Sequence, residues 1–404
     1  MSIVNESIFR VYDIRGKYPD EINEEAVFKI SAALVEFLNP DKLIVAHDGR
    51  KSSELLKESV MTAIMASGAD VIDIGLASSP LFYFTVNRLA AGGGVMITAS
   101  HNPPDYNGLK LVREKAILIG QSNGLSEIKK TAENIVINKI RKGEVIKKDL
   151  SKEYENYLFK KAGIDKEPEI KDIRFEFDSD SDRLLVYEKG KQIRADLLSG
   201  VIIKDFLDKK SFLSGIFRKP IFIYDFRFSK AIPEYILQSG GEAICSRVGH
   251  FFIKEAMRRN RAFFGAELSG HFYFKDVFYV EVPILMKLKL LKIMNETGES
   301  LAELIKPFEK YFHSGEINIE ASDQKQAASL IQRLKENYKD GKIDELDGIT
   351  IGYPTTSFGT SWWFNLRPSN TEPVLRLVVE AETQYVLDQK IKEISDFIEQ
   401  RVTP

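Results

Sequence analysis

Short apolar runs that end in a polar turn recur along this chain. Three of them, residues 42–48, 173–178 and 220–225, end at an aspartate. Such a run is typical of a buried strand that opens into a loop at its carboxyl end. Helical patterns lie between and around these runs, over residues 24–37, 53–67, 229–238 and 298–310. The alternation predicts doubly wound, mixed-sheet α/β domains, whose ligands bind beyond the carboxyl ends of the strands.

The pattern changes near residue 313. Residues 349–353, 361–366 and 374–380 alternate as antiparallel strands do, and residues 384–401 form an amphipathic helical pattern. This combination predicts a separate C-terminal α+β domain. A charged, helical segment over residues 123–161 and a polar junction at 208–219 suggest further boundaries. We therefore expect four domains, at residues 1–150, 151–210, 211–312 and 313–404.

Composition and charge narrow the class of protein. The chain has 404 residues, of which 44% are hydrophobic, so it can bury several cores. Its formal net charge is −2, which gives no basic field for nucleic acid or an anionic membrane, so an anionic ligand must be bound locally. Cys245 is the only cysteine, as a reducing compartment tolerates, and no signal peptide or membrane span is evident. We expect a cytoplasmic protein.

The first candidate loop begins at Thr98, after the small-residue strand 92–97. Ser100 and His101 lie on this turn, and Lys110 follows within the same loop region. A serine on a turn above a sheet can present its hydroxyl, and a nearby histidine and ammonium suit phosphoryl transfer. The alternative is an ordinary Asx/Pro turn.

The second candidate loop follows the apolar run 173–178. Its carboxylates Asp178, Asp180 and Asp182 stand at alternate positions, and they can converge on one hard cation if the chain turns there. A phosphatase of the haloacid dehalogenase type also places two such aspartates after a strand and uses the first as nucleophile. A solvated acidic turn is the third interpretation.

Two further loops carry groups that suit a sugar phosphate. Glu267 and Ser269, between glycines, can hydrogen-bond vicinal hydroxyls, and three of the five histidines, His101, His250 and His271, fall in candidate loops. Near the C-terminus, residues 367–373 combine an arginine with hydroxyl and amide donors, which favours phosphate binding. The residues of this fourth loop that we expect to bind are Arg367, Ser369, Asn370 and Thr371, with Arg376 in the strand beyond.

The four loops, in this order, resemble the signature loops of the α-D-phosphohexomutase superfamily, in particular its phosphomannomutase/phosphoglucomutase branch. The matching segments are 100–103, 178–183, 265–271 and 367–373, and residues 9–16 and 47–50 add support. The resemblance thus runs nearly from end to end.

This resemblance implies a mutase that interconverts hexose 1-phosphate and hexose 6-phosphate, of mannose or glucose, through a bisphosphorylated sugar. Ser100 would carry the phosphate, and Mg2+ would be held by that group with Asp178, Asp180 and Asp182. Arg15, His101 and Lys110 would serve proton transfer and electrostatics. The implied substrate-binding residues are Arg227, His250, Glu267, Ser269, His271, Arg367, Ser369, Asn370, Thr371 and Arg376. A hexose 1,6-bisphosphate would be the activator, and a sugar phosphate the small-molecule partner.

The sequence departs from the family pattern in two places. Ser179 and Ser181 occupy positions where the family usually has glycine, and a positive φ there would strain a serine. Only residues 165–172 separate the helical connection from the strand at 173, which is too short for a parallel crossover. We therefore expect a reduced second domain, which gives a reason to form a homodimer.

A phosphosugar-binding paralogue without catalysis is the alternative function.

Overall fold

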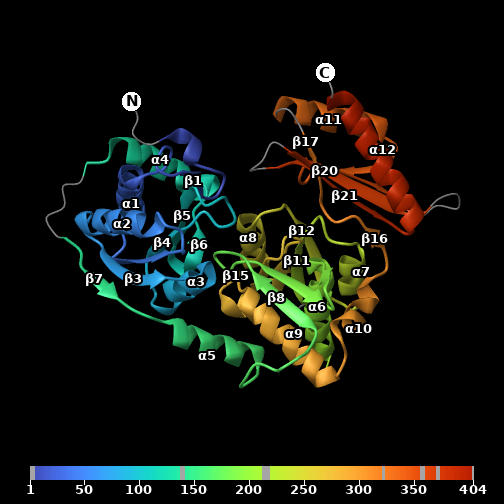
Figure 1. Cartoon of the computed structure of the whole chain (residues 1–404), viewed down its shortest axis with the longest axis horizontal. Coiled ribbons are helices and arrows are strands. Elements are labelled where there is room, and N and C mark those ends of the chain that lie inside the picture. Colours follow the sequence, from blue (N-terminus) through green and yellow to red (C-terminus); the bar gives the residue numbers. More distant parts are fainter. Residues whose placement is uncertain are drawn as a thin grey trace. The chain divides into compact units, whose positions relative to one another are not determined.

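The computed structural model describes residues 5–136, 142–211, 219–320, 324–354, 360–369 and 374–402. The chain folds into two compact units. The first comprises residues 1–169, 174–185 and 271–292, and the second comprises residues 170–173, 186–270 and 293–404. Figure 1 shows the course of the chain through its elements.

The first unit is built on a mixed sheet of order β1-β5-β4-β2-β3-β7, with β6 paired to β5. Strands β4, β2, β3 and β7 run parallel, whereas β5 is antiparallel to both β4 and β1. The strands of this sheet are β1 (Ile14–Lys17), β2 (Lys42–His47), β3 (Asp70–Leu76), β4 (Gly93–Ile97), β5 (Tyr106–Arg113), β6 (Ile117–Leu118) and β7 (Val145–Lys147). The unit also holds β14 (Phe272–Phe274) and β15 (Val280–Glu281), which pair with each other in an antiparallel manner and are not part of this sheet. Its helices are α1 (Glu24–Leu38), α2 (Ser53–Ala66), α3 (Ser79–Arg88), α4 (Leu125–Asn134) and α5 (Ser151–Ala162), and α9 (Pro283–Thr297) begins in this unit.

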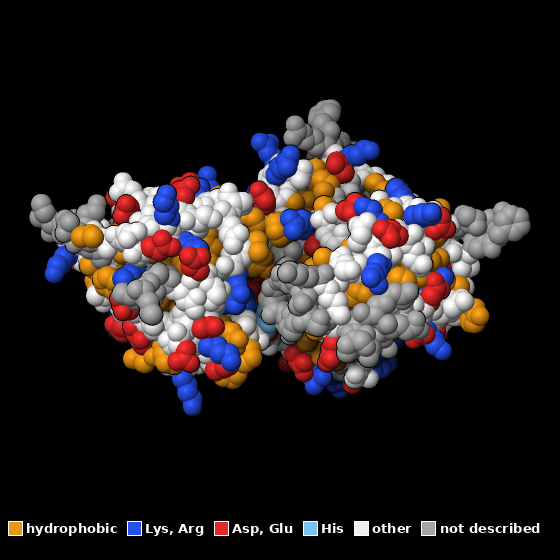
Figure 2. Space-filling view, turned by 90° about the horizontal axis from the view of Figure 1, so that it is seen from above, with side chains coloured by type: hydrophobic (Ala, Val, Ile, Leu, Met, Phe, Trp, Pro, Cys, Tyr) orange, Lys and Arg blue, Asp and Glu red, His pale blue; other side chains and the backbone are white. Residues whose placement is uncertain are grey.

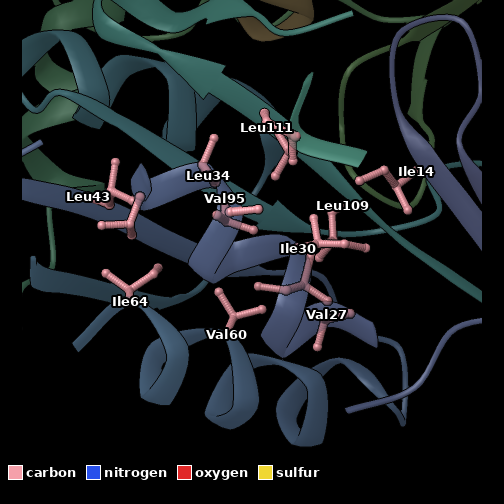
Figure 3. Close-up of a cluster of buried hydrophobic side chains, with 14 of the residues drawn as sticks. Ile14, Val27, Ile30, Leu34, Leu43, Val60, Ile64, Val95, Leu109 and Leu111 are labelled. Carbon is pink, nitrogen blue, oxygen red and sulfur yellow. The ribbon is translucent and has the colours of Figure 1, made fainter. Parts of the chain in front are cut away.

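Helices α1 and α2 direct their apolar faces at this sheet (Figure 3). Val27, Ile30 and Leu34 recur at helical spacing on α1, and each is fully buried. The Asn23 side chain caps the start of α1 by accepting a hydrogen bond from the amide of Ala26 at 3.0 Å. The packed core fixes the sheet, and with it the loops at the carboxyl ends of β2 and β4.

The second unit contains β12, β11 and β13, which are adjacent and parallel strands of a five-stranded sheet of order β12-β11-β13-β14-β15. It also contains an antiparallel sheet of order β16-β21-β20-β19-β18, with β17 paired to β21. Its strands are β11 (Ile221–Asp225), β12 (Glu242–Ser246), β13 (Phe264–Ala266), β16 (Phe312–His313), β17 (Ile317–Glu320), β18 (Lys342–Asp344), β19 (Ile349–Tyr353), β20 (Trp362–Pro368) and β21 (Val374–Ala381). Its helices are α6 (Ala195–Ser211), α7 (Ala231–Gln238), α8 (His250–Asn260), α10 (Leu301–Ile305), α11 (Gln324–Asn337) and α12 (Gln384–Val402). The mixed α/β fold with a C-terminal α+β region is confirmed.

A small sheet of order β10-β9-β8 lies in the chain between α5 and α6. Its strands are β8 (Ile173–Phe177), β9 (Leu184–Glu188) and β10 (Lys191–Ile193), and residues 163–172 before it contain neither helix nor strand. The strand expected at residues 173–178 is present as β8, but our expectation that it is buried is wrong. Phe177, for example, is 38% exposed.

Two other expectations need correction. The helical connection over residues 123–161 contains α4 and α5 but also β7, which pairs with β3 and whose residues are all exposed. The helical pattern over residues 298–310 yields only the short α10, followed by a 3-10 turn at Lys306–Phe308. Pro307 lies in that turn and cannot donate the amide hydrogen bond that a longer helix needs.

Candidate active site

Ser100 lies in the loop that follows β4, where the sequence placed it. Its backbone is left-handed, with φ of 51°, and the residue is only 2% exposed. The Ser100 hydroxyl lies 3.4 Å from Nδ1 of His101. A left-handed serine is uncommon, and such a conformation persists only where the surroundings impose it.

His101 accepts hydrogen bonds at Nδ1. Nη2 of Arg183 lies 3.0 Å from this nitrogen, and a guanidinium can only donate. Burial, together with the charges of Arg183 and Arg15, lowers the pKa of His101 to about 3. The imidazole is therefore neutral near pH 7, with its proton on Nε2.

The acidic loop turns so that its three carboxylates converge. One oxygen of each of Asp178, Asp180 and Asp182 lies within 4.8 Å of the others. The turn is closed by the amides of Asp182 and Arg183, which donate to Oδ1 of Asp178 at 3.0 and 3.1 Å. Ser181 has φ of 54°, so one of the two serines at the family's glycine positions does adopt the strained backbone.

Lys110 of β5 lies among these carboxylates. Its ammonium donates to Oδ2 of Asp180 and of Asp182, each at 2.7 Å, and to the hydroxyl of Ser79 at 3.1 Å. These bonds use all three of its protons, and the side chain is 2% exposed. Burial alone would lower the pKa of Lys110, but the two carboxylates outweigh it and raise that pKa well above its usual value. Lys110 is therefore a fixed cation.

The pKa values of two of these carboxyls shift in opposite directions. Burial and then the charges of Asp182 and Asp180 raise the pKa of Asp178 to about 7. Burial also opposes ionisation of Asp182, but Lys110 and then His271 lower its pKa well below the usual range. The loop thus holds one carboxyl that is easily protonated beside one that stays ionised.

The donor set of this loop could hold a metal ion. Oδ2 of Asp178 and Oδ1 of Asp180 are buried and accept no hydrogen bond from any residue in the described part of the chain. Buried carboxylate oxygens without donors are costly, and a hard cation is a ligand that satisfies them. The three aspartates that the sequence singled out therefore fit a divalent cation.

Arg15 and His271 belong to the same region. Nη1 of Arg15 donates to Oδ1 of Asn102 at 2.6 Å and to the carbonyl of Ala99 at 3.2 Å, and both acceptors lie in the Ser100 loop. His271, which the sequence grouped with Glu267, has its Nε2 3.3 Å from Oδ1 of Asp182. The structure thus brings Arg15, Ser100, His101, Lys110, His271 and the three aspartates together in the first unit.

In the second unit, the Glu267 loop is tied to the His250 loop. The amide of Gly249 donates to Oε1 of Glu267 at 2.8 Å, and Glu267 is 2% exposed. His250 begins α8 and is buried, while Ser269 is half-buried. The amide of Leu268 donates to Oδ2 of Asp225 at 2.9 Å, which links this loop to the end of β11.

Three arginines of the second unit converge on Glu316. Its carboxylate accepts from Arg227 at 2.9 Å, Arg367 at 3.0 Å and Arg376 at 2.8 Å. Asp225 also holds Arg227, through Nε at 3.0 Å and Nη2 at 2.6 Å. Burial opposes ionisation of Glu316, but the charges of the three arginines lower its pKa to about 2.

Arg227, Arg367 and Arg376 thus form one cluster around Glu316. Ser369 is buried beside the end of β20, and its amide donates to the carbonyl of Val374 at 2.8 Å. Asn370 and Thr371 lie outside the described residues.

The sequence did not single out several residues that organise these sites. Glu316 and Ser79 carried no recognisable signal, because each acts through residues distant in the sequence. Asp225 was marked only as the end of an apolar run and was given no role at the site. Arg183 and Arg50 stood inside matching segments but were given no role. No helix within the described ranges is long and apolar enough to cross a membrane. On the face drawn in Figure 2, acidic and basic side chains are interspersed.

The described residues thus hold a buried cluster of a serine, a lysine and three aspartates in one unit and a cluster of three arginines in the other. Three family models match the chain: the phosphoglucomutase/phosphomannomutase α/β/α domain I at residues 6–138, domain III at residues 196–311, and the C-terminal domain at residues 316–396.

Curated relatives match over almost their whole length. A phosphomannomutase of Methanocaldococcus jannaschii is 35% identical, with 97% of both chains covered. A phosphomannomutase of Escherichia coli and a protein of Xanthomonas campestris named "Phosphohexose mutases" are each 32% identical, over 96% of this chain and 98% of theirs. The chain therefore belongs to the phosphoglucomutase/phosphomannomutase family and is a phosphohexomutase.

Solved structures share the fold. A phosphoglucomutase/phosphomannomutase family protein of Burkholderia thailandensis has a TM-score of 0.82 and 22% identity, covering 99% of this chain and 98% of that one. An Aspergillus fumigatus N-acetylphosphoglucosamine mutase, solved with GlcNAc-6P and magnesium, has a TM-score of 0.54 and 15% identity, with 90% and 78% covered.

Proposed function

We propose that this chain interconverts hexose 1-phosphate and hexose 6-phosphate, with mannose or glucose as the sugar, and that Ser100 carries the transferred phosphate. The observation that carries the proposal is the convergence of Ser100, the cation Lys110 and three aspartates in one buried site. An ordinary acidic turn would leave these carboxylates in solvent, without a lysine buried between two of them.

The chemistry is two phosphoryl transfers. In the first, the bond between phosphorus and the Ser100 oxygen breaks as a sugar hydroxyl oxygen bonds to phosphorus, and that hydroxyl loses its proton. The freed Ser100 oxygen takes up a proton in this first transfer. In the second, the bisphosphorylated sugar returns its other phosphate to Ser100: the Ser100 hydroxyl loses its proton as its oxygen bonds to phosphorus, and the released sugar oxygen takes up a proton. The neutral His101, 3.4 Å from the Ser100 hydroxyl, is placed to exchange this proton, and the cations Lys110 and Arg15 offset the charge of the moving group.

We propose Mg2+ as the metal of Asp178, Asp180 and Asp182, with the phosphate on Ser100 as the further ligand. When bound, the ion would neutralise the negative charge of the phosphoryl group in transfer. The support is the pair of buried aspartate oxygens without donors, and the magnesium in the structure of the Aspergillus mutase.

The second unit would recognise the substrate. Glu267 and Ser269 offer an acceptor and a donor for sugar hydroxyls, with His250 in the loop tied to Glu267. His271, which follows in the sequence but belongs to the first unit, would also contact the substrate. The arginines 227, 367 and 376, with Ser369, Asn370 and Thr371, would bind the phosphate that is not being transferred. Arginine forks suit this task because they match the oxygens of a phosphate.

The test is a coupled assay of glucose 1-phosphate and mannose 1-phosphate conversion, with Mg2+ and glucose 1,6-bisphosphate as activator. We expect turnover by the wild type, and its loss in Ser100→Ala. The control is Ser126→Ala on α4, an exposed serine, which should keep the wild-type rate.

Other outcomes would replace the proposal. A folded wild type that binds sugar phosphates in calorimetry but does not convert them is the non-catalytic paralogue. Phosphate trapped on Asp178 instead of Ser100 would indicate the phosphatase mechanism.

A further inference from the structure

The loop that carries Ser100 is held through its carbonyl oxygens. Nη2 of Arg50 donates to the carbonyls of Ser100 and Asn102 at 2.6 and 2.7 Å. Nη1 of the same side chain donates to the carbonyls of Pro103 and Tyr106 at 2.7 and 3.0 Å. One guanidinium thus gathers four carbonyls of a single loop.

Arg50 is itself fixed from the other side. Its Nε donates to Oδ2 of Asp48 at 3.2 Å, so all five of its N–H bonds are used. Oδ1 of Asp48 accepts from the hydroxyl of Ser53 at 2.6 Å and from the amide of Arg50 at 3.0 Å. Asp48 follows β2, which runs parallel to β4 and pairs with it, so the clamp rests on the sheet.

A second donor reaches the same Ser100 carbonyl from the acidic loop. The hydroxyl of Ser179 donates to it at 2.7 Å. The Ser100 carbonyl is therefore held by Arg50 on one side and Ser179 on the other. Since Ser179 lies next to Asp178 and Asp180, this bond joins the acidic loop to the Ser100 loop.

We propose that Arg50 and Ser179 are positioning residues, which hold the Ser100 peptide in its left-handed conformation and so aim its hydroxyl at His101 and the acidic loop. The inference rests on the proposed role of Ser100 as the phosphate carrier. A left-handed serine left to itself would relax to an extended or helical backbone, which would turn its side chain away. Arg50 and Ser179 touch no reacting atom and act through the Ser100 carbonyl.

The planar fork of arginine is what this role needs. A lysine at position 50 keeps the positive charge but offers three donors from one point, so it cannot reach four carbonyls and Asp48 together. At position 179, a hydroxyl is needed, and threonine supplies one as well as serine does. The side chain of Ser179 lies at the surface, so a threonine methyl has room there.

The test compares Arg50→Lys, Ser179→Ala and Ser179→Thr with the wild type in the coupled assay, together with the fraction of Ser100 phosphorylated after incubation with glucose 1,6-bisphosphate. Arg174→Lys, at a side chain 64% exposed, is the matched control. Unfolding temperatures verify that each variant is folded.

We expect kcat to fall about 100-fold in Arg50→Lys, with KM within about twofold of wild type, because a misplaced reacting group costs this much in rate. Loss of one neutral hydrogen bond in Ser179→Ala should lower kcat about three- to tenfold, and Ser179→Thr should restore it. The phosphorylated fraction of Ser100 should fall in step with kcat, and Arg174→Lys should match the wild type.

Folded Arg50→Lys with wild-type kcat, or a loss carried by KM alone, would overturn the inference. If Arg50→Lys does not fold, the two variants at position 179 test the inference. Equal rates of Ser179→Ala and Ser179→Thr would contradict a positioning role of this hydroxyl. A phosphorylated and active wild type with unaffected variants overturns the clamp alone. A wild type that never carries phosphate on Ser100 overturns the proposed function and the clamp with it.

Discussion

The acidic loop of the first unit and the arginine cluster of the second each gather several buried side chains of like charge, and each neutralises most of that charge with groups of the opposite sign. In the first, Lys110 lies among carboxylates, whereas in the second Glu316 lies among guanidiniums. Three aspartates with Lys110 and Arg183 leave one net negative charge, and three arginines with Glu316 and Asp225 leave one net positive charge. Each cluster is thus largely neutralised from within, yet keeps the sign that attracts its expected ligand, a cation or a phosphate.

Removing the charge of Lys110, at the centre of the acidic cluster, should have the largest effect on both rate and stability. In Lys110→Met, Asp180 and Asp182 lose their buried cation, so we expect kcat to fall about 1000-fold and the free energy of unfolding to fall by about 3–5 kcal/mol. Added Mg2+ should raise the unfolding temperature of this variant more than that of the wild type. Kinetics and urea denaturation with and without Mg2+ measure both effects.

The control for this variant is Lys152→Met, at a side chain 79% exposed. It should leave both quantities within experimental error of the wild type. A Lys110→Met protein that keeps more than a tenth of the wild-type rate would contradict the comparison.

The carboxylate of Glu316, at the centre of the arginine cluster, should make the free energy of unfolding depend on pH. The pKa of Glu316 is lowered from 4.5 to about 2, which corresponds to about 3 kcal/mol of stability. Because the folded pKa lies below the unfolded one, this contribution is present in full above about pH 5 and is lost as the pH falls towards 2. Glu316→Gln should therefore be about 3 kcal/mol less stable than the wild type at pH 7, with the gap closing below pH 4.5.

Urea denaturation of both proteins between pH 2 and 7 measures this gap. Glu320→Gln, an exposed position on β17, is the matched control and should show no such gap. A gap for Glu316→Gln that stays constant with pH would show that it reflects packing and not charge.

The acidic cluster should compete for protons as it binds metal. The pKa of Asp178 is raised to about 7, so this carboxyl is protonated in a growing fraction of molecules as the pH falls below 7. We expect Mg2+ affinity, measured by calorimetry, to be constant above about pH 8 and to weaken by up to about tenfold per pH unit below 7. Asp178→Asn should bind Mg2+ more weakly and lose this dependence on pH. A wild-type Mg2+ affinity that is constant from pH 8 to 5.5 would contradict competition between protons and the metal at Asp178.

The smallest effect concerns the backbone of the acidic loop. Ser181 has φ of 54°, so Ser181→Gly should raise the free energy of unfolding by up to about 1 kcal/mol. Ser126→Gly, within helix α4, should lower it by a similar amount, since glycine weakens a helix. Equal signs for the two variants in thermal denaturation would show that the loop is not strained.

The loops of both clusters were predictable from the sequence because each follows a local pattern that marks the end of a strand. Apolar runs that end at Asp178 and Asp225, and the small-residue strand before Ser100, marked strand ends where side chains gather. The pairing of Glu316 with three arginines was not predictable, since the arginines come from β11, β20 and β21 or the loops beside them, and only the fold brings them together. The exposure of β8 was missed for the same reason, because a strand pattern does not reveal whether anything covers the strand.

If the acidic cluster serves a phosphate on Ser100, that residue must become phosphorylated. The most direct measurement is phosphopeptide mapping by mass spectrometry of the full chain, after incubation with glucose 1,6-bisphosphate and Mg2+. We expect phosphate on the peptide containing Ser100 in the wild type and none in Ser100→Ala. Phosphate on Asp178, or no phosphate on a folded wild type, would contradict it.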